Sequence, residues 1–164
     1  MKDKVLSIVV ICLTITLLLG IIVYSYLNNS DNEIKLVDDY TTFFTIDGCI
    51  NRYFGYISDN ENNKLLNILN KEYIIENNIN ENNIIEIVDT LNIRNKISSF
   101  KSIKMYEKRN KNKTEYYVLG KIYYEEDMDT SKYLSDYYIT VIVNENKKTF
   151  DISPYDGKIF KEGF

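Results

Sequence analysis

The chain has 164 residues, 27% of them charged, and a formal net charge of −4 at pH 7. It has no histidine and only two cysteines, which excludes a Ser-His-Asp or Cys-His nucleophile and a disulfide-rich secreted fold, and leaves almost no room for a zinc site. Asparagine, isoleucine and tyrosine are abundant while alanine, glutamine and tryptophan are absent, a bias that we attribute to the AT-rich genome of a low-GC bacterium. We expect neither a cofactor nor a metal.

Residues 5–27 contain no charge in 23 positions. A helix of that length spans roughly 34 Å, enough for a hydrocarbon core of about 30 Å. Lys2 and Lys4 precede the segment, so the positive-inside rule places residues 1–4 in the cytoplasm and the remainder outside the cell membrane. We predict a single-pass anchor at 5–27, a linker at 28–35 and an extracytoplasmic domain at 36–164. The alternative is a cleaved signal peptide, but the apolar run is long and no small-residue cleavage site follows it.

Apolar residues recur at steps of three and four between residues 36 and 57, which predicts one long amphipathic helix on a core. Ser58 and Glu61 have the spacing of a capping box, which indicates that a second helix begins there and ends near Tyr73. Asn77 and Asn78 mark a turn, and a third helix is expected from about residue 80 to about residue 94.

After Ser98 the apolar period changes from helix to strand. Strands are expected at 100–105, 116–124, 136–143 and 148–153, with turns at 110–113 and 144–146 and a polar loop at 125–135. About three helices followed by an antiparallel meander of four strands predict an α+β domain in which the helices cover one face of a curved sheet.

Five segments of the domain carry a resemblance to a known fold: NRYFGYISDNENNKLLNIL, ENNIIEIVDTL, KTEYYVLGKIYYEE, DYYITVIVNE and KTFDISP. Their order resembles the nuclear transport factor 2-like (cystatin-like) fold, in which a long helix and shorter helices lie in the curl of a bent antiparallel sheet. The resemblance also implies a role, because one membrane helix joined to such a domain is similar to inner-membrane assembly proteins of type IV secretion and conjugation machines.

Asp47 is the strongest candidate for a site. On the first predicted helix it projects inside the apolar arc, between Tyr40 and Phe54. A carboxylate there must be paired, protonated or exposed to a wet cavity. In enzymes of the fold that the chain resembles, a cavity acid beside tyrosines serves as general acid or base. The alternative is a carboxylate at the rim, bonded to a tyrosine hydroxyl or to water.

Two further sets of residues are candidates for an interface. Tyr117, Tyr124 and Tyr138 belong to doublets on strands, so one ring of each doublet would stand on the open sheet face and could bind protein or glycan. The alternative is strand propensity combined with codon bias. Gly48 and Gly55 project opposite the apolar arc, where another helix of the chain or a second copy could approach closely. Alternatively, one of these glycines ends the helix.

Three remaining features are interpreted without a function. Cys49 is taken as a small buried hydrophobe, and the basic run at 108–113 as a solvated hairpin turn. Nucleic acid is not an expected partner, because no basic patch recurs on one element. The acidic loop at 125–129 lacks the spacing of a calcium site and is taken as solvated.

The leading functional expectation is a non-enzymatic binding or assembly domain, tethered to the bilayer through residues 5–27 and in contact with an envelope protein or a second copy. The alternative is a small-ligand-binding or enzymatic domain of the same fold, with a cavity at Asp47. A further alternative is an inhibitor or regulator of a neighbouring envelope enzyme.

Overall fold

The computed structural model describes residues 13–25, 33–96, 98–125 and 131–162. The chain forms two compact units, Met1–Glu33 and Ile34–Phe164. In the first unit, residues 13–25 are helical and their side chains are exposed. The rest of the predicted anchor, with Cys12, lies outside the described residues. None of the helices described has both the length and the apolarity required to cross a bilayer.

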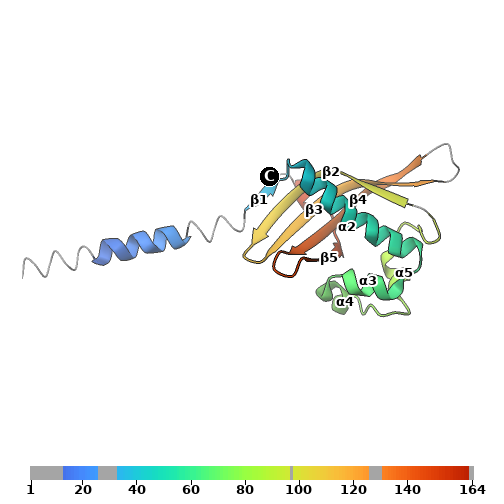
Figure 1. The fold of residues 1–164 in the computed structure, drawn as a ribbon, viewed down its shortest axis with the longest axis horizontal. Coiled ribbons are helices and arrows are strands. Elements are labelled where there is room, and N and C mark those ends of the chain that lie inside the picture. The colour runs from blue at the N-terminus through green and yellow to red at the C-terminus, as the bar shows by residue number, and fades with distance from the viewer. Residues whose placement is uncertain (1–12, 26–32, 97, 126–130, 163–164) are drawn as a thin grey trace, which may run out of the picture. The chain divides into compact units, whose positions relative to one another are not determined.

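The second unit is an α+β domain built on an antiparallel sheet in which neighbours in sequence are neighbours in space (Figure 1). The α+β class and the meander are confirmed, but the described sheet has five strands rather than four. The additional strand, β1, falls where the linker and the start of the first helix were predicted, and three residues are too few to show a period. The strands are β1 (Ile34–Leu36), β2 (Ser98–Asn110), β3 (Lys113–Glu125), β4 (Ser131–Asn144) and β5 (Thr149–Pro154).

Helix α2 (Tyr40–Ser58) lies across one face of the sheet (Figure 1). Its start is fixed by Asp39, whose carboxylate accepts hydrogen bonds from the backbone N–H groups of Thr41 and Thr42 at 3.3 and 2.8 Å. The helix therefore begins four residues later than predicted, and Tyr40 is 82% exposed instead of contributing to the core. The predicted period is otherwise correct, and the buried residues of α2 are Ile46, Ile50, Tyr53, Phe54 and Ile57.

Three short helices, α3 (Asn62–Ile68), α4 (Lys71–Glu76) and α5 (Ile84–Val88), replace the two longer ones that were predicted. The break between α3 and α4 comes from a long-range contact. Leu69 is extended and bridges β5 at Ile152, whose carbonyl accepts a hydrogen bond from the Asn70 N–H at 2.8 Å. Residues with such a partner leave the helix although their local sequence favours it.

The ends of two predicted helices also differ. Ser58 is the last residue of α2, and its hydroxyl donates to the carbonyl of Lys96 instead of capping α3. The chain leaves the helical conformation after Val88, because the Asp89 carboxylate accepts from the backbone N–H groups of Ile93 and Arg94 at 2.6 and 3.0 Å. These two bonds fold residues 89–94 into turns where the third helix was expected to continue.

The core fills the space between α2 and one face of the sheet, which we call the inner face. Its strand residues are each at most 1% exposed: Phe100, Met105, Val118, Ile122, Ile139, Val141 and Ile152. The opposite, outer face carries a helix that was not predicted, α6 (Lys158–Glu162). Phe160 of α6 packs on the rings of Tyr106 and Tyr138, with centroids 5.4 and 5.6 Å away.

Candidate functional site

Asp47 lies on α2 opposite β2, at the point where the pairing of β2 with β3 shifts register between Ser102 and Lys104. The Ser102 backbone N–H donates to the two carboxylate oxygens at 3.2 and 3.4 Å, and the Ser102 hydroxyl donates to one of them as well. Asp47 therefore binds an N–H group on the open edge of β2, next to the register shift.

Asn51, one turn further along α2, makes a second contact of the same kind. Its side-chain amide accepts from the Phe100 N–H at 2.7 Å and donates to the Phe100 carbonyl at 3.0 Å. Strand β1 pairs with β2 only at Tyr106, Glu107 and Lys108. Asp47 and Asn51 thus satisfy edge groups of β2 beyond the end of β1. Sequence reasoning missed Asn51, because an asparagine on a helix gives no local signal that a strand backbone lies opposite.

Two opposing influences act on the pKa of the Asp47 carboxyl. Burial raises the pKa of its carboxyl above the ordinary value of 3.8, while the bonds from Ser102 act to lower it. The side chain is half-buried, and its partner is a serine rather than the expected tyrosine or water. This geometry is the one expected for a structural carboxylate at the rim of the core. Among the residues that the structure describes, no three Cys, Asp or Glu side chains are grouped so as to hold a metal ion.

Two tyrosines, Tyr53 and Tyr137, are weaker acids than an ordinary phenol. Tyr53 and Tyr137 lie side by side in the core, and burial is the main cause that raises the pKa of each hydroxyl. The hydroxyls of Tyr53 and Tyr137 interact with each other, which raises the pKa of Tyr53 further. Both phenols therefore stay protonated at neutral pH.

The predicted tyrosine interface lies on the outer face, where the C-terminal segment covers part of it. The Tyr138 ring contacts Phe160, and Gly157, at φ +75°, passes so close that a Cβ there would lie 2.7 Å from the ring. The Tyr117 ring lies 5.3 Å from that of Tyr155, and its hydroxyl donates to Glu115 at 2.6 Å. The Tyr124 side chain lies outside the described part of the chain. Tyr117 and Tyr138 are thus half-buried by their own chain.

Gly48 and Gly55 lie on one side of α2, which we call the glycine stripe, and no other part of the described chain packs on it. A Cβ added at Gly48 or at Gly55 would meet nothing within 4 Å among the described residues, and α2 continues through both positions. No described helix of this chain therefore approaches the stripe, and neither glycine ends the helix. Phe44, one turn before Gly48, is 73% exposed. Cys49 beside it is half-buried, and burial raises the pKa of its thiol.

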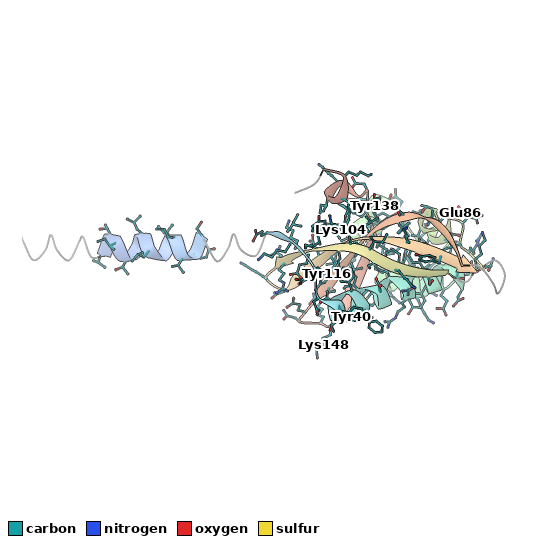
Figure 2. All side chains as sticks on the ribbon, turned by 90° about the horizontal axis from the view of Figure 1, so that it is seen from above. Tyr40, Glu86, Lys104, Tyr116, Tyr138 and Lys148 are labelled. Atoms are coloured by element: carbon teal, nitrogen blue, oxygen red, sulfur yellow. The ribbon has the colours of Figure 1, made fainter. Side chains whose placement is uncertain are left out.

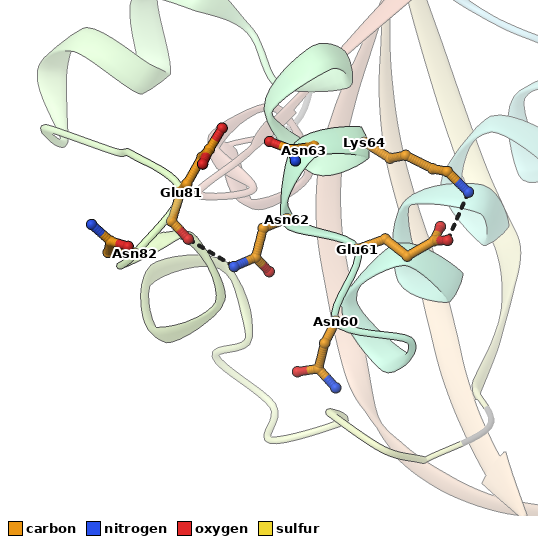
Figure 3. Close-up of a pocket in the computed structure, with 7 residues that line it drawn as sticks. All are labelled: Asn60, Glu61, Asn62, Asn63, Lys64, Glu81 and Asn82. Atoms are coloured by element: carbon orange, nitrogen blue, oxygen red, sulfur yellow. Dashed lines mark hydrogen bonds and ion pairs between the residues drawn. The ribbon is translucent and has the colours of Figure 1, made fainter.

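A surface hollow of about 500 Å³ lies at the start of α3 (Figure 3). Its polar groups largely bind one another: the Lys64 ammonium contacts the Glu61 carboxylate at 2.7 Å, and the Asn62 amide donates to the Glu81 carbonyl at 2.7 Å. Asp47 does not line this hollow. Small-molecule sites are mostly apolar, whereas the lining here is Asn60, Glu61, Asn62, Asn63, Lys64, Glu81 and Asn82.

Two turns that are far apart in the sequence meet at one end of the sheet. The β2–β3 turn is hydrogen-bonded to the β4–β5 turn, because the Glu145 N–H donates to the Asn112 carbonyl at 3.2 Å. The Thr114 hydroxyl also donates to the Glu145 carboxylate at 2.8 Å. This contact joins the basic run at 108–113 to Lys147 and Lys148. The strand register could have revealed it, since Lys113 pairs with Asn144.

Comparison of the chain with protein-family models, with curated proteins and with solved structures gave no match.

Proposed function

We propose that this chain is a non-enzymatic assembly protein, anchored in the cell membrane by residues 5–27 and exposing its α+β domain outside the cytoplasm. The uncharged N-terminal segment and the two lysines before it support the anchor and its orientation. The order of helices and strands supports the proposed nuclear transport factor 2-like arrangement. We propose further that the domain associates with a second copy of itself.

The observation that carries self-association is the solvent-exposed side of α2. Phe44, Gly48 and Gly55 lie on one side of this helix, opposite its buried side chains. Each glycine costs a helix roughly 1 kcal/mol relative to alanine, and no described contact within the chain offsets that cost at either position. A second α2 packed against the stripe would bring two backbones close together and would bury the exposed Phe44 ring.

The alternative of a ligand-binding or catalytic domain has less support. Its key residue, Asp47, is already bonded through both oxygens to Ser102, and the neighbouring core is filled by residues that are at most 2% exposed, including Ile50, Tyr53 and Phe54. Regulation of an envelope enzyme remains a further prediction, which the same surface of α2 would serve with a different partner.

Cysteine cross-linking in membranes tests the proposal. The background chain carries Cys12→Ser and Cys49→Ala, and Gly48→Cys then supplies a single thiol on the stripe. We expect a disulfide-linked dimer after mild oxidation. The matched control is Asn67→Cys, at an exposed position on α3, which should stay monomeric. A Gly48→Cys chain that remains monomeric, or that dimerises no faster than the control, would remove self-association through α2.

A further inference from the structure

The charges of the domain are unevenly distributed along its length. We call the two joined turns, residues 108–113 and 144–148, the basic tip. The basic tip holds six basic residues and one acidic residue. The rest of residues 33–164 holds 12 basic and 21 acidic residues. The segment 59–90, with α3, α4 and α5, alone has seven acidic and two basic residues. Figure 2 shows Lys148 and Glu86 toward opposite ends of the domain.

Most of the positive charge on the basic tip is available to an external partner. Arg109 is paired with Glu107 at 3.0 Å. By contrast, Lys111, Lys113, Lys147 and Lys148 are exposed and form no ion pair with any residue that the structure describes. Four lysines on two adjoining turns attract a surface of negative charge more strongly than any one turn could.

The chain enters the domain from the side of the basic tip. β1 is antiparallel to β2, and its first residue, Ile34, pairs with Lys108, whereas its last residue, Leu36, pairs with Tyr106. The start of β1 therefore lies on the side toward which β2 runs to its turn. Six residues, 28–33, separate the proposed anchor from β1, and they span at most roughly 24 Å.

We propose that the basic tip rests on the anionic phospholipid headgroups of the membrane that holds the anchor. This inference rests on the anchor proposed above. The short link keeps the tip near the headgroups, and the tip charge attracts them. The acidic residues of segment 59–90 are repelled, so the domain stands with α5, which carries Glu86, turned away from the lipid. Tyr40, an exposed ring toward the same end as Lys148 (Figure 2), suits the headgroup region.

Because the chain has no tryptophan, a single introduced Trp reports its own surroundings. The full chain is reconstituted into vesicles of brominated phosphatidylcholine, with or without phosphatidylglycerol. Asn112→Trp places the probe in the basic tip without removing charge. Glu86→Trp is the control at the other end; it removes a negative charge and so favours, if anything, contact with the membrane.

The expected result is strong bromine quenching of the Asn112→Trp probe in anionic vesicles, weaker quenching at 0.5 M salt, and little quenching of the Glu86→Trp probe. The triple variant Lys111→Asn, Lys147→Gln and Lys148→Asn should abolish the difference in quenching between the Asn112→Trp and Glu86→Trp probes. Asparagine is chosen at 111 and 148 because both positions have positive φ. Each lysine near an anionic surface favours the bound orientation by about fivefold, so three of them account for roughly 100-fold. Removing the charge of Lys71, Arg94 and Lys101 should change nothing.

Equal quenching of the two probes would overturn the proposal, and so would quenching of the Asn112→Trp probe that ignores salt and anionic lipid. Alkaline carbonate extraction separates this failure from failure of the anchor. A chain that stays in the vesicles but shows equal quenching refutes only the orientation of the domain. A chain released by carbonate refutes the anchor itself.

Discussion

The inner and outer faces of the sheet are packed differently, although the same strands supply both. On the inner face, α2 covers seven strand residues that are at most 1% exposed. On the outer face, the five-residue helix α6 covers Tyr106 and Tyr138, which remain half-buried. Burial of apolar area is the main source of stability, so the inner face should determine whether the domain folds. The cover on the outer face should contribute less and should open more readily.

The largest expected effect is on the inner face at Phe54. This side chain is 2% exposed, and its ring lies 5.1 Å from that of Tyr53, 5.3 Å from that of Tyr137 and 6.0 Å from that of Phe100. Phe54→Ala should lower the free energy of unfolding by about 3–5 kcal/mol, measured by urea unfolding of the detergent-solubilised chain. If that variant does not fold, Ile50→Val should cost about 0.5–1.5 kcal/mol. An unchanged urea midpoint in both variants would show that the inner face does not determine the stability of the domain.

Gly120 tests how tightly the inner face is packed. A Cβ there would overlap the Phe100 ring and would lie 2.6 Å from the Lys101 carbonyl oxygen. Gly120→Ala should therefore destabilise the domain by about 1–3 kcal/mol in the same urea assay. The matched control is Gly48→Ala on the open side of α2, which should stabilise the domain by up to about 1 kcal/mol when the chain is diluted until it is monomeric. Effects of the same sign at both glycines would contradict the structure.

Substitutions on the outer face should lower the free energy of unfolding by less than those on the inner face. Phe160→Ala removes two ring contacts of α6, with Tyr106 and with Tyr138, and should lower the free energy of unfolding by roughly 1 kcal/mol. Amide exchange of residues 158–161 should speed up, while that of α2 stays slow. A loss of stability as large as that of Phe54→Ala would show that the two faces contribute equally.

The smallest effect is a pH dependence at Asp47, at the rim of the inner face. Its raised pKa means that its contribution to stability is fully present below 3.8 and is lost as pH rises through the pKa of the folded state. The Asn side chain of Asp47→Asn does not ionise, so the variant does not lose this contribution. Its free energy of unfolding should therefore rise relative to that of the wild type as pH rises above 3.8. The gain should be the smallest of these effects, because solvent screens a carboxyl that is only half-buried. Urea midpoints from about pH 3 to pH 7 measure it; a constant difference would contradict the assignment.

The sequence revealed those parts of the domain that depend on repeated local patterns. Ile46, Ile50, Tyr53, Phe54 and Ile57 follow the helical period, and burial on one side of α2 agrees with it. The alternation in β3 and β4 likewise indicated the meander. These elements are long enough for the period to stand out against a composition rich in isoleucine and tyrosine.

Elements held by distant contacts could not be read locally. Leu69 leaves the helix because it bridges Ile152, and β1 exists because Lys108 lies opposite Ile34. The same holds for the candidate site. Helical spacing correctly marked Asp47 as unusual, but its partner Ser102 is 55 residues away. The basic tip escaped notice because each of its two turns, taken alone, is an ordinary solvated turn.

The contacts of Asp47 and Asn51 with β2 have a consequence under the membrane anchoring proposed above. Chains held in two dimensions collide often, and a bare strand margin on one would recruit a strand from the next, with open-ended polymerisation as the result. The free margin of β2 is occupied by β1, Val37, Asp47 and Asn51. Part of the margin of β5 is occupied by Leu69 and Asn70. Among the described residues, these contacts leave less of the sheet margin open to a strand of another copy.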